Sequence, residues 1–227
     1  MYIFEHPKIK DLFDVLLEKL LEESGRGAIL IATAHADDFL TELIVATFPN
    51  EISKKDKERL LNYPGHLSSF SAKIELAFAF RIINKNLRDS LNALRKVRND
   101  AAHSSLPFDL FELQQKMESV YDLGNDTPIV IRNAATRMLV TMKIGKISES
   151  FKNAGYSDEQ KNKALEDLPN DKKRMEIINK QIPHWELMFG ICMICGMIVD
   201  STERITKLKT GISTWDNLLP QENSNTD

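Results

Sequence analysis

The feature that most constrains this chain is the recurrence of apolar residues at spacings of three and four along most of its length. This spacing places apolar side chains on one face of an α-helix, and no segment shows the period of two typical of half-buried strands. Only nine glycines and eight prolines occur in 227 residues, which favours long helices over many strands and turns. The sequence therefore predicts an all-α fold. Between residues 7 and 23 the apolar positions are Ile9, Leu12, Phe13, Leu16, Leu17, Leu20 and Leu21.

Capping and breaking residues divide the chain into a series of helices. Ser24, which is followed by glycine, is expected to end the first helix, and Ser68 or Ser69 to cap a later one. Pro128 suits the first position of another helix, and Pro183 is expected to open the next one. Further helices are predicted at residues 28–48, 51–61, 86–103 and 109–123.

The character of the chain changes after residue 124. We predict a helical domain over residues 1–124, followed by a helical C-terminal extension over residues 125–227. Residues 147–180 are rich in charged and amide side chains with few large apolar ones, which predicts exposed helices or a mobile arm. The polar residues 221–227 are expected to be disordered.

The N-terminal sequence and the two cysteines, too few for a disulfide framework, indicate a cytoplasmic protein. The net charge of −3 does not favour sequence-independent binding to duplex DNA. The first seven residues lack the pattern of a signal peptide. The apolar segment Trp185–Val199 is shorter than the stretch of about 18 residues needed for a membrane span. We therefore expect a buried or subunit-facing helix there, and no membrane partner.

Two small-residue pairs lie on this same segment. Cys192 and Cys195 have no second cysteine pair, and structural zinc needs four ligands, so buried thiols are expected there. Gly190 and Gly196 are expected to allow close helix packing. No glycine-rich phosphate loop or zinc-protease motif occurs. We therefore predict no metal and no small-molecule cofactor.

The candidate site is the segment from Arg98 to His103, at the end of a predicted helix. Asn99 and His103 are four residues apart and share one helical face. Arg98 and His103 are about 140° apart on a straight helix of 3.6 residues per turn. For both to contact one ligand, the helix must bend or end near Ala101, or a second chain must supply half of the site.

These residue types are suited to cleaving RNA without a metal. Arg98 would hold the scissile phosphate and offset the charge of the transition state. His103 would act as general base or acid, and Asn99 would orient the attacking 2′-hydroxyl or the imidazole. The substrate would be RNA because DNA lacks that hydroxyl.

The same side chains are also suited to a structural role. Arginine, asparagine and histidine at a helix end commonly bind unpaired carbonyls or pair with acids on a neighbouring helix. The sequence offers such a supporting polar network. Its members would be Asp37, Asp38 and Glu42 on the second predicted helix, together with Arg95, which precedes Arg98 by three residues.

Two motif blocks resemble the mannitol operon repressor (MltR-like) family. They are HLSSFSAKIELAF at residues 66–78 and LRKVRNDAAHS at residues 94–104, and the resemblance covers roughly residues 27–123. Ala101 stands where that family tends to carry a large aromatic residue. The pattern Arg98-Asn99-x-x-x-His103 is also similar to the signature of HEPN domains. That resemblance implies a usually dimeric helical module, often a metal-independent ribonuclease with its site at the dimer interface.

Two functions follow from these resemblances, on a helical bundle of MltR/HEPN-like type that is expected to form a homodimer. The first, favoured because its resemblance spans more of the chain, is a non-enzymatic regulatory module that affects transcription through a protein partner. The acidic net charge and the lack of a helix-turn-helix argue against direct DNA contact. The alternative is a HEPN-type RNA endonuclease, a toxin or defence effector with RNA as substrate and an antitoxin as possible partner.

Overall fold

The computed structural model describes residues 3–103, 108–167 and 171–211. All the regular elements in these ranges are helices, which confirms the predicted all-α fold class. In chain order they are the 3-10 helix η1 (Ile3–Glu5) and the α-helices α1 (Pro7–Leu20), α2 (Gly25–Thr47), α3 (Lys54–Leu61), α4 (Phe70–Ala79), α5 (Lys85–His103), α6 (Gln114–Tyr121), α7 (Thr127–Asn153), α8 (Asp158–Asp167) and α9 (Lys172–Gly211).

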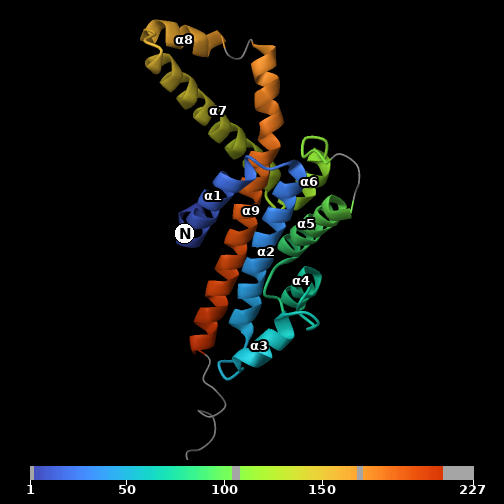
Figure 1. Ribbon diagram of the computed structural model, residues 1–227. Coiled ribbons are helices and arrows are strands. Elements are labelled where there is room, and N and C mark those ends of the chain that lie inside the picture. Colours follow the sequence, from blue (N-terminus) through green and yellow to red (C-terminus); the bar gives the residue numbers. More distant parts are fainter. Residues whose placement is uncertain (1–2, 104–107, 168–170, 212–227) are drawn as a thin grey trace, which may run out of the picture.

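Helices α2 and α9 lie side by side through the middle of the bundle (Figure 1). Helices α1 and α7 pack against α9, while α5 packs against α2 and carries α4 and α6 on its other sides. The buried side chains of these helices form one connected hydrophobic core. The candidate motif therefore lies on a helix that is anchored directly to the central pair.

Serine side chains cap several of the helices. Ser53 and Ser69 each accept a hydrogen bond from a backbone N–H three residues later, at 3.1 Å, as expected of an N-cap. The prediction that Ser69 caps the helix beginning at Phe70 is confirmed. The prediction for Ser24 is wrong: α1 ends at Leu20, and Ser24 caps α2, because its Oγ accepts from the N–H of Gly27 at 3.1 Å.

The segment around Pro183 differs from the sequence prediction. Pro183 lies inside α9 and does not open a helix there, since α9 begins at Lys172. A proline within a helix removes one N–H donor, and the packing of α9 against α1, α2 and α7 offsets that loss. By length and composition α9 could cross a membrane, contrary to the predicted shortfall, but 72% of its most apolar window is buried inside the protein. Such burial is typical of a core helix of a soluble protein.

The part of the chain after residue 124 contributes to the same core as the part before it. Ile191 and Ile198 of α9 are fully buried in that core, along the length of α2. Helix α7 and the first turns of α9 extend beyond the bundle and lead to α8 (Figure 1). The described side chains of α8 are mostly exposed, as predicted for residues 147–180. The prediction of disorder for residues 221–227 lies outside the described residues.

The small residues of α9 occupy tight positions. Cys192 and Cys195 are both fully buried and free, which confirms the prediction of buried thiols. A Cβ atom on Gly190 would overlap the ring of Tyr121, and one on Gly196 would overlap Ile3. Close packing at both glycines is therefore confirmed, and it draws α6 and η1 onto α9.

Candidate functional site at the end of α5

Helix α5 carries the candidate motif on the side that faces away from the core. The side chain of Asn84 accepts a hydrogen bond from the N–H of Leu87 at 2.9 Å and so caps the first turn. From there the helix continues without interruption to His103. Its buried residues recur at helical spacing and fix the rotation of the helix; they are Leu87, Ser90, Leu91, Leu94, Val97 and Ala101.

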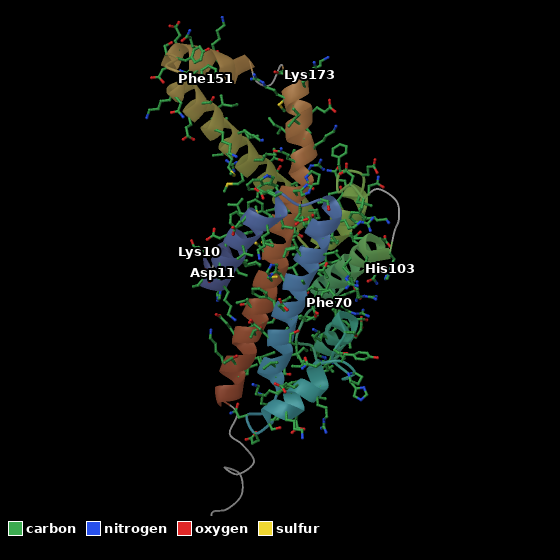
Figure 2. All side chains as sticks on the ribbon, in the orientation of Figure 1. Lys10, Asp11, Phe70, His103, Phe151 and Lys173 are labelled. Carbon is green, nitrogen blue, oxygen red and sulfur yellow. The ribbon has the colours of Figure 1, made fainter. Side chains whose placement is uncertain are left out.

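This rotation leaves Arg98 and His103 exposed and Asn99 half-buried. A guanidinium nitrogen of Arg98 donates to the Oδ1 of Asn99 at 3.3 Å, so these neighbours form a joint polar group. Figure 2 shows His103 at the outer edge of the molecule, on the side away from Lys10 and Asp11 of α1. Because α5 is unbroken up to His103, the side chains of Arg98 and His103 leave the helix about 140° apart. A single chain therefore does not bring them to one point.

The acids predicted to support the motif contact other residues. Asp37 lies 2.5 Å from the Nζ of Lys73, and Glu42 lies 2.6 Å from the Nζ of Lys8. Asp38 is exposed on α2. Within the described part of the chain, the Arg98 guanidinium has no ion pair with a carboxylate, and its hydrogen-bond partner is Asn99. Arg95 donates from its Nε to the side chain of Asn92 at 3.3 Å.

Arg26 is a further cation at this end of α5 that the sequence analysis did not identify. It stands in the first turn of α2, and its guanidinium donates to the backbone carbonyl of Ala101, in the last turn of α5. Its guanidinium carbon also lies 5.8 Å from the ring centroid of Phe108. The contact satisfies one of the carbonyls that a helix end leaves unpaired, and it places positive charge at the negative end of the helix dipole. It bridges 75 positions in the sequence, so no local pattern could have revealed it.

Ala101 differs from Arg98 and His103 in its burial. Its side chain is fully buried, at the point where the resembled family tends to carry a large aromatic residue. On the next face of the helix Asp100 pairs with Lys116 of α6, at 2.9 Å. The end of α5 is therefore held from two sides, by Arg26 of α2 and by α6, while Arg98 and His103 stay exposed.

Two charged side chains lie buried in the core, away from the motif. Lys73 of α4 pairs with Asp37 and also donates to the hydroxyl of Thr41 at 2.7 Å. Glu186 of α9 lies 3.5 Å from the Nε of Arg132. Burial raises the pKa of Glu186, and the nearby Arg132 partly offsets this rise. Among the described residues, no group of three or more histidine, cysteine or acidic side chains could hold a metal ion.

Comparisons with models of protein families, with curated proteins and with solved structures found no match. The resemblance to MltR-like proteins and to HEPN domains therefore stays a prediction from the sequence. What the arrangement can do chemically rests on its side chains. Arg98 can bind a phosphate, Asn99 can position a polar group beside it, and the His103 imidazole can accept or donate a proton. The three can act on one substrate only where a second copy supplies the missing side.

Proposed function

We propose that two copies of this chain bring the ends of their α5 helices together and form a metal-independent RNA endonuclease in the cytoplasm. The observation that carries this proposal is the exposure of Arg98 and His103, together with the lack of an ion pair to Arg98 among the described residues. In a purely structural motif at a helix end, Arg98 and His103 would form ion pairs or hydrogen bonds with side chains of neighbouring helices. Here two of the acids predicted to hold the motif, Asp37 and Glu42, bind Lys73 and Lys8, and the motif stays available to a substrate.

The proposed reaction needs only groups that the two copies and the RNA supply. Arg98 binds the scissile phosphate and neutralises charge as it develops on the phosphate oxygens. His103 of one copy takes the proton of the 2′-hydroxyl, whose oxygen then bonds to phosphorus. The bond from phosphorus to the 5′ oxygen breaks, and the same His103, now protonated, gives that oxygen its proton. The products are a 2′,3′-cyclic phosphate and a 5′-hydroxyl.

Cleavage of RNA in the presence of EDTA tests this proposal. The purified parent protein is expected to cleave single-stranded or structured RNA, and Arg98→Ala and His103→Ala to abolish cleavage. Matched controls are Arg137→Ala and His66→Ala, which remove an exposed arginine and an exposed histidine elsewhere on the surface. Circular dichroism confirms the folding of each variant. Activity that survives in the Arg98 and His103 variants, or that is lost equally in the controls, would overturn the proposal.

The second candidate function is the regulatory module that acts through a protein partner. It is favoured by the angle of about 140° between Arg98 and His103 on an unbroken helix. In a single chain the two side chains therefore form part of an exposed surface and do not converge on one ligand. On this proposal Arg98 would be a contact for an acidic group of the partner. Absence of cleavage by the parent protein under every condition, with folded and monomeric protein, would support the regulator over the ribonuclease.

A further inference from the structure

A cavity of about 420 Å³ lies between α6, the start of α7 and α9. Glu118 of α6 lines it, and so does Asp122, directly after the end of that helix. Helix α7 contributes Ile129 and Arg132, and α9 contributes Glu186. We refer to this cavity as the α6 pocket.

The most buried charged side chain of the α6 pocket is that of Glu186. This residue is only 4% exposed, and its Oε1 accepts no hydrogen bond from the described residues. The Nε of Arg132 lies 3.5 Å away, within the range of an ion pair but too far for a normal hydrogen bond. Burial of a charged oxygen without a hydrogen-bond donor is costly. A ligand that brings an N–H donor would therefore satisfy Glu186.

Arg132 does not provide that donor, because Gln114 binds its guanidinium. With the side-chain amide oriented so that its oxygen faces Arg132, Gln114 accepts from Nη1 at 2.9 Å and from Nη2 at 2.5 Å. The Arg132 side chain is also 51% exposed, so water screens its charge. The ion pair with Glu186 is therefore loose, and the direct hydrogen bond to Oε1 is left unmade.

The charge of the α6 pocket favours a cation. Among the described residues, three carboxylates line it beside a single cationic side chain, that of Arg132. Glu118 and Asp122 are exposed and form no ion pair within the described part of the chain; Asp122 accepts only from the backbone N–H of Gly124, at 3.3 Å. Carboxylates gathered at a concave surface raise the local concentration of cations.

The lining suits an extended organic cation better than a metal ion. No group of three or more histidine, cysteine or acidic side chains among the described residues could hold a metal, so these three acids do not converge on one point. The remaining lining includes apolar surface of Tyr121, Pro128 and Ile129. A linear polyamine carries ammonium groups separated by short methylene chains. It can therefore place positive charge at dispersed carboxylates and methylene groups on apolar side chains.

We propose that the α6 pocket binds a linear polyamine. One terminal ammonium donates to the Oε1 of Glu186 and supplies the hydrogen bond that Arg132 leaves unmade. The methylene chain lies against Tyr121 and Ile129, which removes apolar surface from water. A second ammonium pairs with Glu118. This inference is independent of the proposed ribonuclease, because it uses no residue of the motif on α5.

Isothermal titration calorimetry of the full-length protein with spermidine tests the proposal. We expect saturable binding by the parent, weakened about tenfold or more in Glu186→Gln and several-fold in Glu118→Gln. The matched control is Glu149→Gln, which removes an exposed acid of α7 that does not line the pocket and should bind like the parent. Butylamine, which has a single ammonium group, should bind about tenfold or more weakly than spermidine.

A second variant tests the pocket without changing its charge. Ser119→Trp places a large side chain in the pocket from an exposed position of α6 and should abolish binding. Circular dichroism confirms the folding of each variant. The proposal would be overturned by a parent that shows no saturable binding, by equal affinities of the parent and Glu186→Gln, or by binding that survives in folded Ser119→Trp. Equal affinities for butylamine and spermidine, or displacement of spermidine by an equal concentration of Mg²⁺, would also contradict it.

Discussion

The Nζ of Lys73 lies 2.5 Å from the Oδ1 of Asp37, and this pair ties α4 to α2 inside the bundle. The Lys73 side chain is only 6% exposed, and its ammonium also donates to Thr41. Asp37 was predicted to support the motif on α5, and it pairs with Lys73 of α4 instead. The buried ammonium takes this carboxylate, and Arg98 stays exposed on the far face of its own helix.

Removal of one partner from this pair should destabilise the fold. Asp37→Ala would leave a buried ammonium with a single hydroxyl partner, and loss of a partner from a buried pair costs about 3 kcal/mol or more. Because Asp37 itself is about a third exposed, water will compensate part of this cost. The matched control is Glu42→Ala, whose pair with Lys8 is half-exposed and should contribute less than about 1 kcal/mol. Urea denaturation measures both, and equal losses would contradict the structural role of Lys73.

Gly190 should not tolerate a methyl group. Gly190→Ala would press a Cβ into the ring of Tyr121, and such overpacking costs about 1–3 kcal/mol. Gly145→Ala on α7 is the control, because nothing lies within 4 Å of the position of its added Cβ. Alanine there should stabilise the helix by about 0.5–1 kcal/mol. Thermal unfolding of the two variants should therefore shift in opposite directions; shifts in the same direction would mean that α6 does not contact α9 at this position.

The two cysteines should be unreactive in the folded protein. Burial raises the pKa of Cys192 to about 12, and burial also raises that of Cys195 well above its ordinary value. Since the thiolate is the reactive form, both thiols should resist a disulfide reagent such as DTNB until the protein unfolds. The rate of reaction should follow the fraction unfolded in a urea series. Rapid reaction of either thiol without denaturant would show that α9 is accessible where the structure buries it.

The stability of the fold should depend on pH through Glu186. Burial raises its pKa. At pH values between the unfolded-state and the folded-state pKa, the folded protein therefore holds a proton on Glu186 that the unfolded protein has released. Below the unfolded-state pKa both states are protonated and burial of the carboxyl carries no charge penalty. As pH rises through the unfolded and then the folded pKa, the free energy of unfolding falls by the cost of the buried charge.

Glu186→Gln should remove this dependence. The variant should gain stability relative to the parent as the pH is raised from 4 to 8, as measured by urea denaturation. Glu149→Gln, at an exposed position of α7, serves as control and should follow the parent. A difference between Glu186→Gln and the parent that is constant with pH would show that the carboxyl is not desolvated.

The sequence patterns predict the helices of this fold well, but they predict the contacts between the helices less well. The all-α class, the cap at Ser69 and, to within one residue, the helix start at Pro128 follow from apolar spacing and capping chemistry, which act within a few residues. The interior position of Pro183 does not follow, because packing along α2 keeps α9 helical through a residue that ordinarily ends helices. Ser24 can end one helix or begin the next, and only its extended backbone decides which.

In the candidate site, too, some features could be predicted from the sequence and others could not. Exposure of Arg98 and His103 follows from the buried stripe of α5, which the apolar spacing already marks. The burial of Lys73 had a readable signal, because it lies three residues after Phe70 and four before Ala77, on the apolar face of its helix. The contact of Arg26 with Ala101 had none, since it depends on how α2 and α5 pack.

The most direct test of a site shared between two copies is the activity of a mixed dimer. One copy carries Arg98→Ala and the other His103→Ala, with different affinity tags so that the mixed dimer can be purified. If each site takes Arg98 from one copy and His103 from the other, the mixed dimer retains one complete site of two. It should then cleave RNA in EDTA at ~50% of the parental rate, while both single-variant homodimers are inactive. An inactive mixed dimer beside an active parent would show that the site is not shared in this way, and an inactive parent would contradict the ribonuclease itself.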